Sequence, residues 1–286
     1  MPSPALPGAL IPLQYHYHML SDQARLGAFQ QAIAAVVQPG QVVLELGCGT
    51  GVLSFLASQR ARKVWAVELL PEMVNTSRHL LAQNGVADRV EVIHADAHDY
   101  LPPEPVDVVI CEMLHSALLQ ESQLSVMRTF CQRYQAHFGN LPRFLPEATL
   151  LGVQLIEQQY DFAGYHAPVP LFRQADSLDE HVRLRSEAQC VLSLDYRQPL
   201  PASMQWAHTF HIEQSGLCNA LRLITKHLLA ILPDTARSID WHSQYLHWPL
   251  PKPMQLQPGM KLTIRANYAA GAPVMALTQG LQIEVH

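Results

Sequence analysis

The 286-residue chain lacks the sequence features of secreted, membrane-spanning and nucleic-acid-binding proteins. Its five cysteines are odd in number, widely spaced and free of any C-x-x-C pair, which argues against a disulfide framework or a zinc site. No apolar run is long enough to cross a membrane, and no lysine- and arginine-rich run indicates a nucleic-acid groove. The proline-broken start lacks the basic region of a signal peptide. We therefore expect a cytoplasmic protein with reduced cysteines, no metal site, and no nucleic-acid or membrane partner.

The composition is that of a globular protein with a sizeable core. Hydrophobic residues make up 49% of the chain, and the length suits one large domain or two modest ones. The formal net charge of −5 is compatible with a cationic substrate but does not imply one.

The first half of the chain alternates strand-like and helix-like segments. A first helix is expected over 18–37, with Ser21 as its N-cap, because apolar residues recur there at helical spacing. Strands are expected at 41–46, 63–68, 90–96 and 106–112, and helices at 51–59, 71–85 and 117–137. Strands that alternate with helices indicate a parallel sheet of the open α/β type, a Rossmann-like fold.

This alternation stops near Pro146. Beyond it, β-prone runs at 148–157, 189–196, 204–213, 219–229 and 260–269 are separated by turn-forming residues. We therefore predict an α/β domain over 1–146 and a mainly antiparallel, β-barrel-like domain over 147–286. The polar stretch at 160–188 is expected to be an irregular or partly helical arm.

A glycine-rich turn is the strongest functional signal. The sequence VVLELGCGTG places Gly47, Cys48 and Gly49 after a predicted strand, and Glu68 ends the next strand. The two glycines let the backbone approach a ligand closely, and the carboxylate can accept hydrogen bonds from both ribose hydroxyls. The G-x-G-x-G spacing favours a nucleoside with a small amino-acid tail over a dinucleotide. The alternative is an ordinary tight turn beside a solvated glutamate.

The next predicted strand ends at the same edge of the sheet, in the sequence HADAHD. We expect Asp96, Ala97 or His98 to contact the adenine edge, because ligands of such folds sit outside the carboxyl ends of the strands. The alternative for each residue is an exposed loop position.

The order of these motifs resembles the protein arginine methyltransferase family, over roughly residues 15–286. The matching residues are H-x-x-M-x-x-D-x-x-R (His16, Met19, Asp22, Arg25), VLELGCGTG, VWAVE, EMLHSALLQE (112–121) and LHW (246–248). The resemblance implies a Rossmann-like methyltransferase domain that binds S-adenosylmethionine, followed by a β-barrel.

The resemblance also implies roles for the residues of the first helix. Arg25 would bind the cofactor carboxylate, for which a bidentate arginine pair is well suited. His16 would line the cofactor or substrate pocket, and Met19 would lie beside the transferred methyl group.

The two glutamates of the 112–121 segment would form the acceptor site. Glu112 follows a strand, and Glu121 lies nine residues later, so the intervening turn can aim both carboxylates into one pocket. A guanidinium is planar, permanently charged and rich in donors, which matches two flanking carboxylates. His247, polarised by Asp22, would accept a proton or form a pocket wall, and Trp248 would cover the site.

The chain departs from the family pattern in several places. Segment 5–15 lacks the family's tyrosine series, His115 replaces a glycine, and Leu246 replaces the threonine of the T-H-W loop. Segment 160–188 is too short for a full dimerisation arm, so we expect at most a homodimer with a shortened arm. The acceptor is predicted to be protein arginine or a small guanidino compound such as free arginine. The alternatives are another small-molecule N or O nucleophile, or a cofactor-binding scaffold without turnover.

Overall fold

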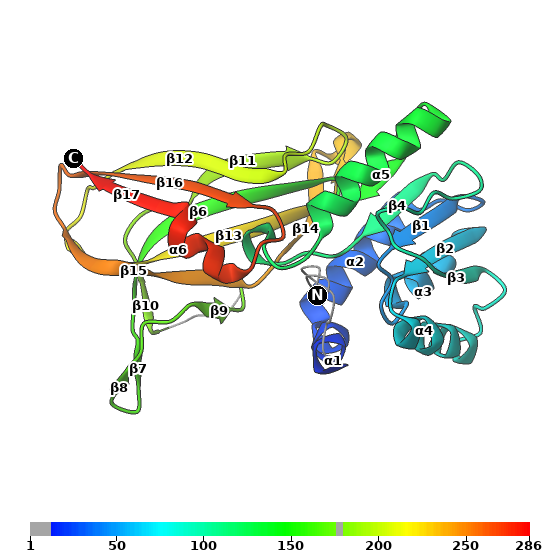
Figure 1. Cartoon of the computed structure of the whole chain (residues 1–286), viewed down its shortest axis with the longest axis horizontal. Helices are drawn as coiled ribbons and strands as arrows, with labels where there is room; N and C mark the ends of the chain where they lie inside the picture. Colours follow the sequence, from blue (N-terminus) through cyan, green and yellow to red (C-terminus); the bar gives the residue numbers. More distant parts are fainter. Residues whose placement is uncertain (1–12, 176–179) are drawn as a thin grey trace, which may run out of the picture.

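The structure is a computed structural model that describes residues 13–175 and 180–286. Figure 1 shows an α/β half, which contains the early strands, beside an elongated half built from the later strands. The expected fold class, a Rossmann-like domain followed by antiparallel β structure, is confirmed.

The α/β half contains a parallel sheet in the order β3-β2-β1-β4-β5. Its strands are β1 (Val42–Leu46), β2 (Lys63–Glu68), β3 (Val90–His94), β4 (Val108–Cys111) and β5 (Arg143–Leu145). Every residue of the central strand β1 is buried, as expected for a parallel strand covered on both faces. The carboxyl ends of β1 to β4 therefore lie along one edge of the sheet.

Helices cover this sheet. They are α3 (Val52–Ser58), α4 (Pro71–Gln83) and α5 (Gln123–Phe138), and α4 and α5 lie on opposite sides of the sheet in Figure 1. The segment predicted as one helix at 117–137 instead contains the short 3-10 helix η1 (Ser116–Leu118) before α5. Left-handed backbone conformations at Ala117 and Gln120 prevent a continuous helix there.

The first predicted helix is divided in two, α1 (Leu13–Ser21) and α2 (Gln23–Val36). Asp22, not Ser21, is the N-cap of α2: it has an extended backbone, and its carboxylate accepts a hydrogen bond from the Arg25 amide at 2.9 Å. The expectation for Ser21 was therefore wrong, because its hydroxyl instead donates back to the His18 carbonyl of α1.

The second half, here called the β domain, is antiparallel. One sheet has the order β10-β6-β13-β15-β9, with β11 also paired to β6 and β14 to β13; a second has the order β12-β16-β17. The strands are β6 (Ala148–Gln158), β9 (Leu171–Arg173), β10 (Val182–Leu184), β11 (Gln189–Asp195), β12 (Ser203–His211), β13 (Gly216–Leu232), β14 (Arg237–His242), β15 (Tyr245–Leu256), β16 (Lys261–Ala269) and β17 (Leu281–Val285). Short helical turns η2 (Pro233–Thr235), η3 (Val274–Ala276) and α6 (Leu277–Gly280) complete it.

The arm region forms strands. A hairpin of β7 (Asp161–Phe162) and β8 (Tyr165–His166) projects from the β domain in Figure 1. Helix is absent from the described part of 160–188, which corrects the expectation of a partly helical arm. The left-handed Ala163 and Gly164 provide the tight turn that a two-residue hairpin needs.

Helix α2 connects the two halves. It packs against α3 on one side and against β13 and β14 on the other, with Phe29 fully buried beside Trp241. The buried apolar residues consequently form a core that is continuous between the halves. Within the described chain, no helix is both long enough and apolar enough to cross a membrane.

Candidate active site

A cavity of about 480 Å³ opens at the carboxyl edge of the parallel sheet. Of the fourteen residues that the sequence assigns to the site, it is lined by twelve: His16, Met19, Arg25, Gly47, Cys48, Gly49, Glu68, Asp96, Ala97, His98, Glu112 and Glu121. The strand ends and helix α1 thus bring together residues more than a hundred positions apart. We refer to this space as the first cavity.

The glycine-rich turn forms the floor of the first cavity. The Gly47 and Cys48 amides donate to the Val67 carbonyl at 2.9 and 2.8 Å, which ties the turn to strand β2. Gly47 and Gly49 both have positive φ angles, and a Cβ atom at Gly47 would lie 3.2 Å from the Met113 sulfur. Side chains at these positions would therefore strain the backbone and narrow the cavity.

Glu68 lies at the end of β2 and is 8% exposed. One carboxylate oxygen accepts from the Gly49 amide and the other from the Leu70 amide, each at 2.9 Å. These bonds fix the carboxylate in the cavity wall. Each oxygen keeps a further lone pair that a ligand hydroxyl can use.

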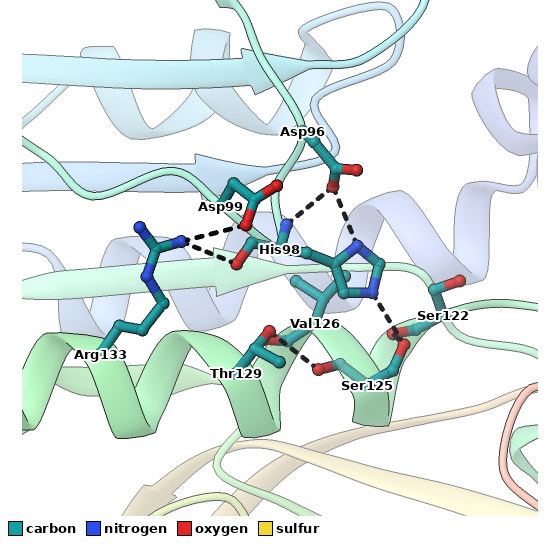
Figure 2. Close-up of polar contacts among 8 residues, drawn as sticks. All are labelled: Asp96, His98, Asp99, Ser122, Ser125, Val126, Thr129 and Arg133. Carbon is teal, nitrogen blue, oxygen red and sulfur yellow. Dashed lines mark hydrogen bonds and ion pairs between the residues drawn. The ribbon is translucent and has the colours of Figure 1, made fainter.

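The residues after β3 form a hydrogen-bonded chain, shown in Figure 2. The His98 ring contacts Asp96 through Nδ1 at 2.9 Å and Ser125 Oγ through Nε2 at 3.0 Å. Partial burial raises the Asp96 pKa, but hydrogen bonds from His98 and its charge outweigh this effect, so the net shift is downward. Ser125, which the sequence pattern did not indicate, belongs to α5 and also lines the cavity.

Arg25 and Glu112 form an ion pair whose side chains are 6% and 8% exposed. Arg25 also donates to the Met19 carbonyl at 3.3 Å, while its Nε atom is buried without a hydrogen-bond partner. Burial alone would lower the Arg25 pKa, but the charge and hydrogen bond of Glu112, together with the charges of Asp22 and Glu45, outweigh it and raise the pKa. The two residues, assigned by the sequence to different ligands, therefore contact each other.

Glu121 accepts a hydrogen bond from the Tyr15 hydroxyl at 3.0 Å. Burial, followed by the nearby charge of Glu112, raises the Glu121 pKa to about 7. Tyr15 was missed by the sequence analysis, although it directly precedes the H-x-x-M motif. Glu45, between the valines and glycines of the turn motif, was also missed; burial raises its pKa to about 8.

A second cavity of about 730 Å³ lies on the side of α1 and the β domain. It shares Met19, Arg25 and Glu112 with the first cavity, so these three residues form the wall between the two. His115 and Phe172 also line it, with their rings in edge-to-face contact at 5.4 Å. The two cavities therefore meet at the carboxylate of Glu112.

The remaining two predicted site residues, His247 and Trp248, lie elsewhere. Both belong to β15 and line neither of these cavities; Trp248 is part of the hydrophobic core. His247 is fully buried, with Nδ1 2.6 Å from Gln158 Oε1, and Nε2 accepts from Arg222 at 3.1 Å. Asp22 caps α2 instead of contacting His247. The expectations of a proton-accepting or pocket-forming histidine and a covering tryptophan are therefore corrected.

Comparisons with known proteins agree with this architecture. A family model described as a methyltransferase domain matches residues 43–134. An uncharacterised protein of Methanocaldococcus jannaschii is 27% identical over 271 residues, 94% of this chain and 96% of the relative. The protein arginine N-methyltransferase PRMT10 of Oryza sativa subsp. japonica is 42% identical over 114 residues, 38% of this chain and 30% of the relative.

A further relative, the probable protein arginine N-methyltransferase 6 of Arabidopsis thaliana, is 35% identical over 179 residues, 61% of this chain and 39% of the relative. The matched part of the chain thus spans about a third of the length of these plant enzymes. Among solved structures, a Trypanosoma brucei PRMT1 enzyme–prozyme complex with AdoHcy has a TM-score of 0.71 at 18% identity, covering 94% of this chain and 96% of that chain. Arabidopsis thaliana protein arginine methyltransferase 10 has a TM-score of 0.75 at 17% identity, covering 89% and 87%.

The residues of the first cavity fit S-adenosylmethionine. The glycine turn leaves room for a close backbone approach, and Glu68 presents oxygens suited to ribose hydroxyls. Both ring nitrogens of His16 and the Nε atom of Arg25 are buried in the cavity wall without protein partners, as expected of groups that bind a polar ligand. Together with the family match, this makes the chain an S-adenosylmethionine-dependent class I methyltransferase that resembles the protein arginine methyltransferases.

Proposed function

We propose that the chain is an N-methyltransferase that acts on a guanidinium group, either of protein arginine or of a small guanidino compound such as free arginine. The observation that carries this proposal is the pair of carboxylates, Glu112 and Glu121, that line the first cavity, with Glu112 also in the wall of the second. The contact between Arg25 and Glu112 supports it, because it places a guanidinium against one of these carboxylates.

We assign the first cavity to S-adenosylmethionine. Glu68 would accept hydrogen bonds from the ribose hydroxyls, and the backbone of Gly47, Cys48 and Gly49 would lie against the ligand. The unpartnered Nε of Arg25 would bind the carboxylate of the amino-acid tail. The His16 ring would complete that end of the cavity, and the segment Asp96-Ala97-His98 would contact the adenine edge.

The cofactor supplies an electrophilic methyl group carried on a cationic sulfur. Glu112 and Glu121 would hold the acceptor guanidinium and orient one nitrogen, which reduces the barrier by positioning. Met19 lies in the wall between the cavities and would pack beside the transferred methyl group. Glu121, with a pKa of about 7, is suited to accept the proton that the acceptor nitrogen loses.

The acceptor would enter through the second cavity. Arg25 and Glu112 neutralise each other there, and Asp22 adds negative charge, which favours a cationic acceptor. The contact between His115 and Phe172 partly fills this space, and a narrowed entrance favours a small guanidino compound. A peptide remains the alternative form of the same acceptor.

We further propose that any homodimer uses the short β7–β8 hairpin as its arm. The exposed aromatic rings of Phe162 and Tyr165 support this assignment. We also propose a cytoplasmic location, which the five unpaired cysteines support.

A second candidate function is methylation of a neutral N or O nucleophile. Arg25 and Tyr15 already engage Glu112 and Glu121, so a guanidinium must share or replace these partners. A neutral acceptor would need only one carboxylate as a general base. A cofactor-binding scaffold without turnover would need neither carboxylate.

The test is methyl transfer from labelled cofactor to a peptide panel and a guanidino-metabolite panel, with Glu112→Gln and Glu121→Gln as variants. If both carboxylates hold a guanidinium, the two variants should show comparable rate losses. We expect losses on the order of a hundredfold to several thousandfold, equivalent to about 3–5 kcal/mol. The surface variant Glu91→Gln is the control, since Glu91 is exposed and forms its ion pair with Lys63 outside both cavities. One large loss and one negligible loss would favour the neutral nucleophile, and two negligible losses would refute the proposal.

A further inference from the structure

The segment between the two carboxylates, Glu112–Glu121, has an unusual backbone. We call it the carboxylate loop. Ala117, Leu118 and Gln120 have φ angles of 56°, 55° and 61°, in the left-handed region that side chains other than glycine rarely adopt. Elsewhere in the described chain, only Ala163 and Ala236 share this conformation outside glycine. The strained backbone therefore lies between Glu112 and Glu121, the two carboxylates proposed to hold the acceptor.

The β domain supplies the hydrogen bonds that hold this strained segment. The Ala117 amide donates to Thr225 Oγ1 at 2.7 Å, and the Tyr268 hydroxyl donates to the Ala117 carbonyl at 3.0 Å. Thr225 is fully buried and Tyr268 is 5% exposed, so water does not readily replace either partner. Both main-chain polar groups of one left-handed residue are thus satisfied by side chains of the β domain.

Three more bonds connect the same two parts. The Gly271 amide donates to the Leu118 carbonyl at 2.9 Å, the Gln120 amide to the Ala272 carbonyl at 2.9 Å, and Ser116 Oγ to the Gln244 carbonyl at 2.6 Å. Gly271 also packs closely, since a Cβ atom there would lie 3.1 Å from the Glu121 carbonyl oxygen. The β domain consequently contacts the loop from Ser116 to Glu121.

We propose that Thr225 and Tyr268 are positioning residues, which hold the strained carboxylate loop so that Glu121 faces the acceptor together with Glu112. Neither side chain lines the first or the second cavity, so each acts through the loop and not on the ligand. Strained backbone persists only where surrounding structure over-determines it, and these bonds provide that constraint. The inference rests on the proposed function of the two carboxylates.

The test compares Thr225→Val, Thr225→Ser and Tyr268→Phe with the wild-type protein. Valine keeps the shape of threonine but leaves the Ala117 amide without its acceptor, whereas serine keeps the hydroxyl. We expect Thr225→Val and Tyr268→Phe to lower kcat for the acceptor about ten- to a hundredfold, as displaced catalytic groups do. The cofactor Kd should change little, and Thr225→Ser should restore turnover.

Two measurements separate positioning from a general structural effect. Amide hydrogen exchange over residues 114–121 should be faster in Thr225→Val and Tyr268→Phe, because the loop opens more often. The matched control is Thr263→Val, which removes a buried hydroxyl bonded to Thr209 within the β domain, away from the loop. That variant should leave both exchange over 114–121 and kcat unchanged.

Several outcomes would overturn the inference: unchanged kcat and exchange in the first two variants, an equal loss of kcat in Thr225→Ser, or an equal loss in Thr263→Val. If Thr225→Val does not fold, Tyr268→Phe carries the test. If the wild-type protein methylates no acceptor, the proposed function fails, and the exchange measurement alone decides whether these residues position the loop.

Discussion

Arg25 and Glu112 form a buried ion pair in the wall shared by the two cavities. The sequence pattern assigns Arg25 to the cofactor and Glu112 to the acceptor, yet in the structure each contacts the other. One guanidinium is therefore placed between two anions, the carboxylate of Glu112 and the carboxylate expected on the cofactor. The stability of this pair and the affinity for cofactor are consequently linked.

Replacement of Arg25 by alanine should lower both stability and cofactor affinity. Removing one partner of a buried pair leaves an uncompensated charge, which typically costs about 3–5 kcal/mol of the free energy of unfolding. Urea unfolding and calorimetry measure the two effects. The double variant Arg25→Met with Glu112→Gln should recover the stability but not the cofactor affinity. If Arg25→Ala had the same free energy of unfolding as the wild-type protein, the pair would not stabilise the fold.

Replacement of Glu68 by alanine should weaken cofactor binding by about 1–3 kcal/mol, the cost of a lost charge-assisted hydrogen bond. The variant also removes the acceptor of the Gly49 and Leu70 amides, so the turn becomes less constrained. Calorimetry with S-adenosylmethionine and with its demethylated product measures the change. Glu91→Ala is the surface control, and equal affinities of Glu68→Ala and the wild type would exclude the assigned role.

Turnover should fall as the pH drops below about 7, because Glu121 becomes protonated and can no longer pair with a cation. The hydrogen bond from Tyr15 lowers the Glu121 pKa, so its removal in Tyr15→Phe should raise that pKa. The acidic midpoint of the pH–rate profile should then move to higher pH. A midpoint that stays in place in this variant, or moves to lower pH, would contradict the contact between Tyr15 and Glu121.

Replacement of His247 by alanine should act on stability and not on proton transfer. It removes the hydrogen bonds that His247 makes with Gln158 and Arg222, a loss of about 1–3 kcal/mol in the free energy of unfolding. The folded variant should keep the wild-type midpoint of its pH–rate profile. A stable variant whose pH dependence disappears would restore His247 as a proton acceptor.

The α/β half was predicted well because its inner strands β1 and β4 are buried throughout and its elements are separated by clear turn signals. The ends of parallel strands share one edge, so the placement of Gly49, Glu68 and Glu112 around one cavity followed from the chain alone. For the β domain, the sequence predicted antiparallel β structure but not which strands pair. Strand β15 contains Pro249, Pro251 and Pro253, which indicate a loop locally. In the structure Pro251 and Pro253 lie where the pairing with β13 shifts register, between Pro249 and Met254.

The missed site residues share a cause: their roles depend on contacts between distant segments. Tyr15 and Glu121 are 106 positions apart, and His98 and Ser125 lie on different elements. Local patterns contain no information on such pairs. For the same reason, the L-H-W sequence did not reveal that His247 faces Gln158 inside the β domain.

The β domain holds the carboxylate loop mainly through the loop's main-chain atoms, so most side chains of the loop are not needed for these contacts. Four of the five described bonds to the β domain use the loop's backbone atoms, and only Ser116 contributes a side chain. His115, which faces the second cavity, takes part in none of them. Substitutions at His115 can therefore alter which molecule is accepted while the carboxylates stay in place, so that acceptor preference can change between lineages without loss of the underlying chemistry.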